Sequence, residues 1–423
     1  MPEHRNNPSV SLLDSLPLKA ELRMAARILH ISTWKVPCGI ATYCDNFVRS
    51  LVKAGFENEV FPLIPSYWPD FLPDDIAEWR GSLLNKATGF DLVHIQHEHG
   101  LFGYALGQKF ACKRYGSILS GLRFLNIPCV TTFHTDMETR KHSGLKGILN
   151  RFKRNRLWGK YVCNNFRGGN VRARAIVHTR RTRKSFVKHG FPISSVHVIP
   201  HPCLSPRKIQ LDSVSAKVSL NLPTDSKLVT IFGFLGKYKG HDIAIEAMKK
   251  LPENYCLALV GGMHPEAKDS FLDSLMLSIP QDLQSRIRIT GWVDRETADR
   301  YFAATDICLA PYRADTELSG SGAITWALSS GKPVIASKID AFQNVNRISE
   351  CMFMFTPGCV SELSWAIQKI ANDRALSEML VNRATEFCVS HSWDAAVADV
   401  INIYEEVGMK PGNVGEKVIS QVA

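Results

Sequence analysis

The stretch ELSGSGAITWALSSGKPVIAS, residues 317 to 337, carries the strongest structural signal in the chain. The small residues from Ser319 to Gly322 let backbone N–H groups approach a ligand closely, and a helix expected from about Ala323 to Ser330 points its positive dipole end the same way. Gly331 suits the left-handed residue that ends such a helix, and Pro333 prevents its continuation. The stretch predicts a phosphate-binding turn, with a serine-capped helix before an ordinary buried strand as the alternative.

Apolar runs without strict alternation recur along the chain, separated by helix-like segments. Such runs indicate strands buried on both faces, and therefore parallel sheets covered by helices. They lie at residues 27–32, 59–63, 91–96, 128–134, 175–179, 196–200, 227–235, 255–261, 286–290, 306–311 and 332–337. The length of 423 residues and the hydrophobic content of 45% suit two separate cores. The sequence predicts an α/β fold with two doubly wound, Rossmann-like domains facing a cleft.

The domain boundary is expected between Pro200 and Leu222, where prolines and serines interrupt every periodic pattern. The first domain is predicted over residues 25–203 and the second over 222–388. A final helix is predicted over 389–408, because its apolar positions recur at helical spacing after a capping serine.

Cysteine usage and apolar run lengths favour a cytoplasmic protein. The eleven cysteines are odd in number and contain no CxxC pair, and several lie in strand-like runs such as ICLAP. They are expected to be free buried thiols in a reducing compartment rather than a disulfide framework or a zinc site. The sequence contains no signal-peptide pattern and no apolar run of about eighteen residues, so no transmembrane helix is expected.

The net charge of +11 is concentrated in one part of the chain. Between Glu138 and Asp212 there is no acidic residue, while eighteen lysines and arginines lie from Arg140 to Lys208. Aromatic residues interrupt this basic segment at 140–190, which suits an anionic membrane surface, a polyphosphate or a nucleic acid. Membrane or lipid-phosphate contact is expected, with a solvated charged face as the main alternative and nucleic acid as the least favoured partner.

Polar residues follow several predicted strands, at the sheet edge where ligands of such folds bind. Gly39 opens a helix after the first strand, and His134 follows the fourth. The HEH run at 97–99 follows the third, but adjacent residues on an extended segment point to opposite faces, so a metal site is not expected there. The second domain opens with GFLGKYKGHD, whose glycines permit close approach and whose Lys239 can neutralise a phosphate.

Taken in order, these pieces resemble the retaining family 4 glycosyltransferases of the GT-B fold, also called glycosyl transferases group 1. The matching pieces are PCGIATYC, DLVHIQHEHGLFG, VTTFHTD, VIPHP, FGFLGKYKGHDIAIEA, ITGWV, DICLAPY and SGSGAITWALSSGKPVIAS. They cover nearly the whole chain, and their order is more specific than any one of them. The resemblance implies an acceptor-binding first domain, a second domain that binds a nucleotide diphosphate sugar, and a final helix that crosses back to the first domain.

The resemblance also implies the site residues. His134 would lie beside the donor sugar and the acceptor, with Glu98 and Asp136 as its catalytic neighbours. Backbone groups around Trp292 and Val293 would hold the base. The other donor-binding positions are Gly39, Gly233, Lys239, Glu317, Ser321, Gly322 and Thr325. Attack on the face that the leaving group departs from requires no enzyme nucleophile, and neither a metal nor another cofactor is expected.

Two departures from the family pattern concern the donor site. Members usually carry two glutamates that flank the phosphate-site helix, but Glu317 is followed eight positions later by Thr325, and alignment on Gly331 places Trp326 at the second glutamate. An arginine often found early in the second domain is replaced by Phe234. The altered pair motivates the alternative of a non-catalytic GT-B protein that binds a nucleotide sugar or a partner.

The function expected from these features is hexose transfer, with retention, from a nucleotide diphosphate sugar to a glycan or lipid-linked acceptor in cell-surface polysaccharide or glycolipid synthesis. The basic segment predicts a peripheral location at the inner face of the membrane. Sugar-nucleotide epimerisation, another GT-B reaction, would release free product without an acceptor, and nucleic-acid binding would weaken steeply with salt.

Overall fold

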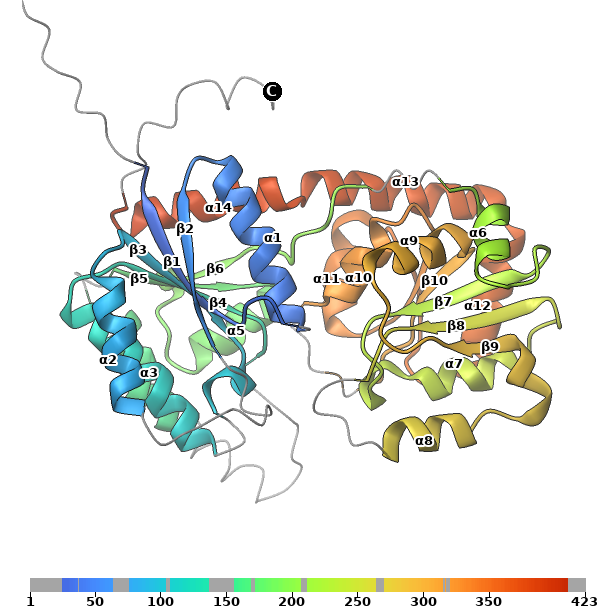
Figure 1. Cartoon of the computed structure of the whole chain (residues 1–423), viewed down its shortest axis with the longest axis horizontal. Coiled ribbons are helices and arrows are strands. Elements are labelled where there is room, and N and C mark those ends of the chain that lie inside the picture. The colour runs from blue at the N-terminus through green and yellow to red at the C-terminus, as the bar shows by residue number, and fades with distance from the viewer. Residues whose placement is uncertain are drawn as a thin grey trace, which may run out of the picture.

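The computed structural model describes residues 25–36, 38–63, 76–103, 107–136, 156–168, 172–206, 211–263, 270–314, 316 and 320–409. They form two lobes, each built on a six-stranded sheet (Figure 1). All neighbouring strands in both sheets are parallel. This arrangement confirms the predicted α/β fold with two doubly wound sheets.

The first sheet has the order β2-β1-β3-β4-β5-β6. Its strands are β1 (Arg27–Ser32), β2 (Glu57–Pro62), β3 (Leu92–His97), β4 (Cys129–Phe133), β5 (Ala173–Val177) and β6 (Val196–Val198). The accompanying helices are α1 (Gly39–Lys53), α2 (Ile76–Ala87), α3 (Gln108–Phe124), α5 (Arg180–Lys188) and the 3-10 helices η1 (His99–Phe102), η3 (Cys163–Phe166) and η4 (Ile193–Ser195). The order reverses between β1 and β3, which directs ligands to the carboxyl ends of the strands.

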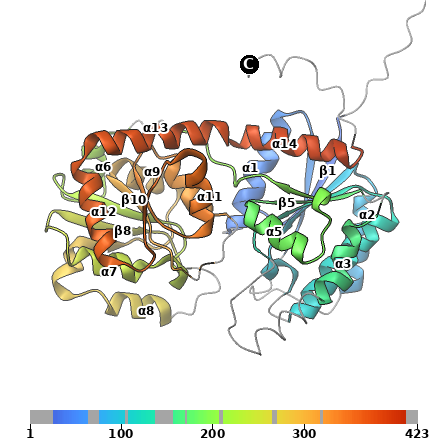
Figure 2. The ribbon, with the colours of Figure 1, turned by 180° about the vertical axis from the view of Figure 1, so that it is seen from behind.

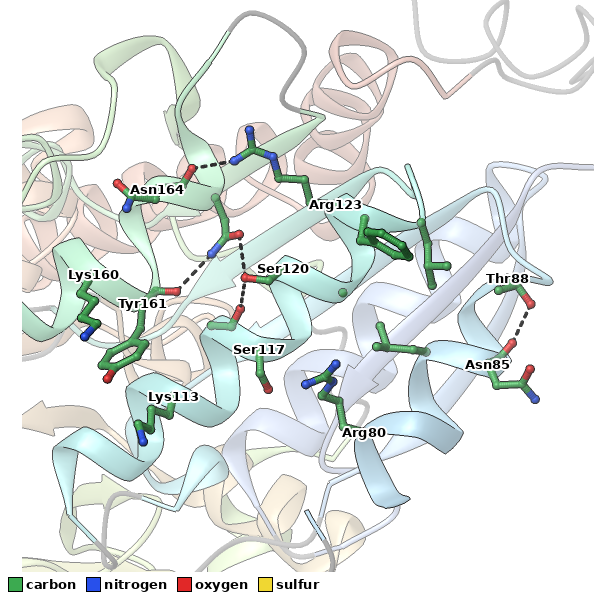
Figure 3. A pocket seen from close by; sticks show the side chains of 16 residues that line it. Arg80, Asn85, Thr88, Lys113, Ser117, Ser120, Arg123, Lys160, Tyr161 and Asn164 are labelled. Carbon is green, nitrogen blue, oxygen red and sulfur yellow. Dashed lines mark hydrogen bonds between the residues drawn. The ribbon is translucent and has the colours of Figure 1, made fainter. Parts of the chain in front are cut away.

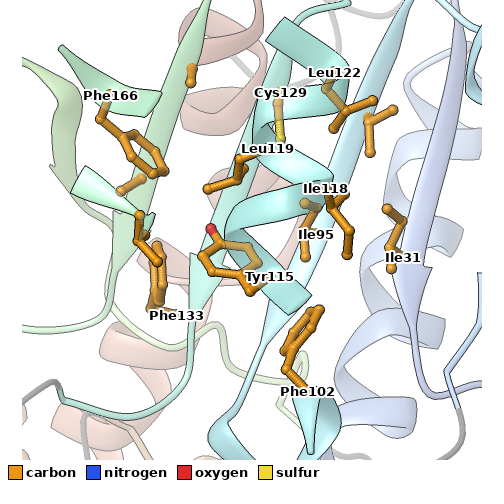
Figure 4. Close-up of a cluster of buried hydrophobic side chains, with 14 of the residues drawn as sticks. Ile31, Ile95, Phe102, Tyr115, Ile118, Leu119, Leu122, Cys129, Phe133 and Phe166 are labelled. Atoms are coloured by element: carbon orange, nitrogen blue, oxygen red, sulfur yellow. The ribbon is translucent and has the colours of Figure 1, made fainter. Parts of the chain in front are cut away.

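Alternate side chains of the first sheet enter two different cores. Leu29 and Ile31 of β1 belong to a core shared with α3, where Tyr115 and Ile118 are fully buried (Figure 4). Ile28 belongs to the opposite core, which contains α1 and the last helix of the chain. Burial on both faces explains why these strands read as continuous apolar runs.

The second sheet has the order β12-β11-β10-β7-β8-β9. Its strands are β7 (Lys227–Phe232), β8 (Tyr255–Val260), β9 (Ile287–Ile289), β10 (Ile307–Ala310), β11 (Val334–Ser337) and β12 (Phe353–Phe355). Helices and 3-10 turns in this lobe are α6 (Ser213–Ser219), η5 (Lys237–Lys239), α7 (His241–Met248), α8 (Ser270–Leu277), η6 (Gln281–Arg286), α9 (Arg295–Ala304), α10 (Gly322–Leu328), α11 (Asp340–Ser349) and α12 (Val360–Asn372). The order reverses between β7 and β10, again placing ligands at the carboxyl ends.

The C-terminal helices α13 (Arg374–Ser390) and α14 (Trp393–Glu406) join the two lobes. They run across both lobes, and α14 lies over the first sheet in opposite views (Figures 1 and 2). Tyr404 of α14 is fully buried in the core with α1, and its hydroxyl lies 2.6 Å from His94 Nδ1. A further link between the lobes is the ion pair of Arg181 in α5 with Asp340 in α11. The last helix is therefore a structural part of the first lobe.

The eleven cysteines are all free thiols, as predicted, and nine of them are buried. Within the described ranges, no helix combines the length and the apolar character that crossing a bilayer demands.

Candidate active site

The main electrostatic feature of the second lobe is a buried lysine beside the end of β7. Lys239, the last residue of η5, is 3% exposed, and its Nζ donates to the Phe232 carbonyl at 3.1 Å. Burial lowers the pKa of Lys239 to about 7. The described residues give this nitrogen no carboxylate partner. Because a buried cation without a counter-ion is costly, the arrangement suits an anion that arrives with a ligand.

Three segments of the second lobe meet at the Lys239 side chain. Gly233, directly after β7, has a φ of 99°, and a Cβ there would lie 2.6 Å from Lys239 Nζ and 3.4 Å from the Ala323 Cβ. Ala323 lies in the first turn of α10, which Ser321 caps with its side chain. Gly322, the first residue of that helix, is exposed. The end of β7 and the start of α10 therefore meet at the Lys239 ammonium group.

Two histidines of the first lobe lie against this turn. His178 follows β5 and His201 follows β6. A Cβ at Gly320 would lie 3.0 Å from the His201 Cβ and 3.3 Å from His178 Cδ2, and a Cβ at Gly322 would lie 3.9 Å from His201 Nε2. A ligand held by the second lobe at this turn is thus within reach of imidazole groups from the first.

His134, at the end of β4, is part of a chain of hydrogen bonds. Its Nε2 lies 2.9 Å from Gln96 Oε1 and its Nδ1 lies 3.4 Å from His178 Nε2, while His178 Nδ1 lies 3.0 Å from the Ile199 carbonyl. A carbonyl only accepts, so His178 carries its proton on Nδ1 and its Nε2 accepts from His134 Nδ1. His134 Nε2 is then an acceptor, which requires the Gln96 amide N–H to face it.

A second observation also favours the orientation in which the amide N–H of Gln96, and not its oxygen, faces His134 Nε2. As placed, Gln96 Nε2 is buried and has no hydrogen-bond partner among the described residues. Turning the amide by half a rotation points this N–H at His134 Nε2 and removes the unpaired donor. The chain therefore fixes one neutral tautomer of His134.

Tyr43 of α1 packs at the centre of these imidazoles. Its ring centroid lies 4.6 Å from His134, 5.3 Å from His201 and 4.7 Å from Trp393. Burial lowers the pKa of His178 to about 4 and that of His201 to about 3, and burial together with the neighbouring histidines holds the pKa of His134 well below its usual range. All three side chains are neutral at pH 7, so they offer hydrogen bonds rather than positive charge.

The two carboxylates predicted to be catalytic also make local hydrogen bonds. Glu98 caps η1 by accepting from the Gly100 N–H at 2.6 Å, and Asp136 accepts from the Ser185 hydroxyl at 2.5 Å. Their roles in a reaction stay predictions. Gly39 opens α1, and a Cβ there would meet no other atom within 4 Å in the described part of the chain. The space beside this helix start is open to a ligand.

Two aromatic rings lie at the end of β9, where the base is predicted to bind. Trp292 is 63% exposed, and its ring centroid lies 5.8 Å from that of Phe234. Val293 packs partly buried on the core behind it. The exposed Trp292 ring suits contact with the face of a base, and the half-buried Phe234 ring adds aromatic surface where the family often has a charge.

The positions that correspond to the second glutamate have structural roles here. Thr325 is buried, and its hydroxyl donates to the Gly322 carbonyl at 3.0 Å. The Trp326 ring stacks on Phe232, with centroids 5.1 Å apart. Glu317 lies outside the described residues. Helix α10 itself, GAITWAL, contains no carboxylate, so it supplies none to a ribose.

The described residues contain no group of three histidine, cysteine or acidic side chains arranged for a metal ion. His97 of the HEH run is buried against Phe102, with ring centroids 5.0 Å apart. The expectation that no metal takes part stays a prediction.

Sequence reasoning missed His178 and His201 as site residues. The signal was present, since each follows a strand as His134 does. The sequence alone does not show that the ends of β4, β5 and β6 converge on Tyr43 and on the turn before α10.

Two family models match the chain: Glycosyltransferase Family 4 at residues 62–203 and Glycosyl transferases group 1 at residues 226–373. Phosphatidyl-myo-inositol mannosyltransferase of Mycobacterium leprae is 25% identical over 220 residues, which are 49% of this chain and 54% of that protein. The chain spans about half the length of this and other curated relatives that it matches.

Two solved structures share the architecture of nearly the whole chain. Sucrose-phosphate synthase of Thermosynechococcus elongatus has a TM-score of 0.67 at 21% identity, covering 90% of this chain and 99% of its own. Anabaena HepE, solved with UDP and glucose, has a TM-score of 0.65 at 17% identity, covering 89% of this chain and 99% of its own. These likenesses, with the two parallel sheets, confirm the GT-B architecture.

Proposed function

Because the chain belongs to the GT-B glycosyltransferases of the family 4 type, we propose that it transfers a hexose, with retention, from a nucleoside diphosphate sugar to a glycan or lipid-linked acceptor. The observation that carries the proposal is Lys239, a buried cation whose described neighbours include no carboxylate, at the meeting point of Gly233 and α10. A diphosphate would supply the missing negative charge.

Charge on the leaving group determines the roles of the residues. As the bond from the anomeric carbon to the β-phosphate oxygen breaks, Lys239 and the amides near Gly322 stabilise the growing negative charge. The acceptor hydroxyl bonds to that carbon on the same face, and its proton passes to the departing phosphate. Neutral His134, fixed by Gln96 and His178, would orient the sugar and the acceptor. This route needs no enzyme nucleophile.

The acceptor side of the proposal is a glycan or lipid-linked acceptor at the inner face of the membrane. One relative is named for a mannosyl transfer to phosphatidyl-myo-inositol, which makes a glycolipid acceptor a reasonable first choice. Much of the predicted basic segment, residues 140–155 and 169–171, lies outside the described residues.

Some described members of the basic segment have structural roles instead. Arg172 Nε donates to the Val407 carbonyl at 2.7 Å, and Arg174 Nε pairs with Glu406 at 3.1 Å. Both arginines hold the end of α14 against the first lobe. The side chains of these two residues are committed to the protein, so contact of the basic segment with an anionic membrane stays a prediction that rests on its other members.

The donor is tested by measuring thermal stability against UDP, GDP, ADP and their sugars. A ligand that binds only the folded state raises the midpoint by mass action, and UDP is the first choice because HepE was solved with it. The expected result is a rise with one base only, followed by transfer to a glycolipid acceptor with the anomeric configuration retained by NMR. No rise with any nucleotide would overturn the proposal.

The non-catalytic alternative is favoured by one observation, the loss of a carboxylate from α10. It predicts nucleotide-dependent stabilisation without hydrolysis or transfer of the sugar. Release of free hexose from the bound donor over time would contradict it.

Binding of the diphosphate is expected to depend on pH through Lys239. An anion beside Nζ favours the ammonium form, so the pKa rises from about 7 on binding and a proton is taken up above that pH. Affinity should therefore fall as pH rises from about 7 to 9. Calorimetric titration with UDP in buffers of different ionisation enthalpy measures the uptake, and an unchanged uptake in Lys239→Met would contradict this assignment.

A further inference from the structure

A second candidate site lies on the first lobe, outside the donor turn. It is a cavity of about 960 Å³ over α3, bounded by α2 and by residues 160–165 (Figure 3). In both views of the fold, α2 and α3 lie on the side of the first lobe that faces away from the second lobe (Figures 1 and 2). A ligand in this cavity would not compete with one at Lys239.

Two glycines of α3 allow the walls of the cavity to approach its floor. A Cβ at Gly116 would lie 2.1 Å from the Tyr161 carbonyl oxygen, and a Cβ at Gly121 would lie 2.4 Å from Leu84 Cδ1 of α2. Asn165 is buried at the base, where its amide N–H donates to the Tyr161 carbonyl at 3.1 Å and its carbonyl accepts from Ser120 at 3.1 Å. The walls are therefore held by close packing and by buried hydrogen bonds, which gives the cavity a defined shape.

The charges that line the cavity are all of one sign. Four cationic side chains come from three segments: Arg80, Lys113, Arg123 and Lys160. None of the lining residues is acidic. Along the chain, the stretch from His99 to Thr135 contains no acidic residue either, so α3 brings no neutralising charge of its own. Arg123 Nη1 donates to the Asn164 carbonyl at 3.0 Å, which fixes its guanidinium group at the edge of the cavity.

A neutral donor adds to the positive charge. The cavity is also lined by the amide of Asn164, whereas the Ser117 hydroxyl donates to the Arg114 carbonyl at 2.8 Å. The aromatic ring of Tyr161 lies beside Lys160, whose Nζ is 5.4 Å from the ring centroid. Several cations with an amide donor in one concave space match the chemistry of a phosphate group on a polar headgroup. All four cations are exposed, and a glycan without charge would make no use of the positive charge that they gather here.

We propose that this cavity binds a multiply charged, phosphate-bearing headgroup, either free in solution or presented by an anionic lipid. The rim of the cavity supplies the reason to test the lipid source. Phe124 is 90% exposed and Leu125 is 38% exposed, both lining the same cavity as Arg123. An exposed aromatic beside basic side chains is typical of contact with a membrane interface. The proposal stands independently of sugar transfer.

The test compares charge reversals inside and outside the cavity. Binding of inositol hexakisphosphate is measured by calorimetry for the parent, Lys113→Glu, Lys160→Glu and Lys250→Glu, the last being an exposed lysine of the second lobe. Each cavity variant should lose at least about tenfold in affinity, since a charge-assisted contact becomes a repulsion, whereas Lys250→Glu should match the parent. Thermal unfolding of each variant verifies that it is folded.

A second arm separates the two sources of the headgroup. Co-sedimentation is measured with vesicles containing phosphatidylinositol phosphate in phosphatidylcholine, with phosphatidylcholine alone as the blank, for the parent, Lys160→Glu, Phe124→Ala and the control Lys250→Glu. If both Lys160→Glu and Phe124→Ala lose vesicle binding, the headgroup is presented by a lipid and Phe124 inserts into the membrane. If only Lys160→Glu loses binding, the cavity binds the headgroup without insertion of Phe124. Equal binding by Lys160→Glu, Lys250→Glu and the parent in both arms, or no binding by the parent in either, would overturn the proposal.

Discussion

Lys239→Ala should lose the nucleotide-dependent rise in melting temperature and slow transfer by about 10²–10³-fold, the effect of removing one donor group to developing charge. The lysine is placed for this role by burial and by Gly233, whose missing Cβ leaves room for Nζ. Among the described residues, Lys239 is the one buried lysine or arginine that lies beside the turn before α10. The measurement is a thermal shift with the preferred nucleotide, followed by initial rates of transfer.

Lys250→Ala is the matched control for this prediction, because it removes an exposed lysine of the same lobe and should leave both readouts unchanged. Gly233→Ala should resemble Lys239→Ala, since a Cβ at 2.6 Å from Nζ, at a φ of 99°, must displace the ammonium. Nucleotide binding by Lys239→Ala with parent affinity would show that the diphosphate lies elsewhere.

The same lysine should limit the stability of the ligand-free protein. Its pKa is lowered from 10.5 to about 7 on folding, so the unfolded chain binds the proton more tightly between these values. The contribution of Lys239 to the free energy of unfolding therefore rises with pH across this window and is most unfavourable below pH 7. Lys239→Met removes that cost, so this variant should melt at a higher temperature than the parent at pH 6, with a smaller difference at pH 9.

Local patterns predicted most of the fold because the strands are buried on both faces. Runs such as RILHIS and YCLALV can be read without tertiary information, and each predicted run became a strand within three residues of its expected bounds. The strand β12 was missed, although it lies in the apolar run CMFMF and is as long as the predicted strands β6 and β9. The left-handed Gly331 was predicted from the residues alone, and its φ of 72° confirms it.

Pairings between distant segments account for what the sequence could not supply. His201 meets Gly320 across more than a hundred residues of chain, and no local pattern encodes that contact. Conversely, Trp326 looked like a loss at the donor site, but its ring completes a stack with Phe232 in the core of the second lobe. The type of a residue at an aligned position shows which chemical groups it carries. The role of that residue depends on the side chains that the fold places beside it.

His134→Ala should reduce transfer by at least about 10²-fold while leaving nucleotide affinity within about twofold of the parent. The separation follows from the fold: His134 belongs to the first lobe, and the lysine proposed to hold the diphosphate belongs to the second. Loss of the imidazole removes a group at the carboxyl end of β4 and leaves Gln96 and His178 without their partner. Initial rates and calorimetry on the same preparations measure the two effects.

His178 hydrogen-bonds to His134, so its variants test how far the position of the His134 imidazole matters for the rate. His178→Ala removes the acceptor for His134 Nδ1 and should lower kcat by about tenfold, whereas His178→Gln places an amide oxygen near the Nε2 position and should recover part of that loss. Since burial holds the pKa of His178 near 4 and that of His134 well below its usual range, neither should titrate between pH 6 and 8. Parent rates in His134→Ala, or a rate inflection near pH 6.5 abolished by that substitution, would contradict a neutral, orienting imidazole.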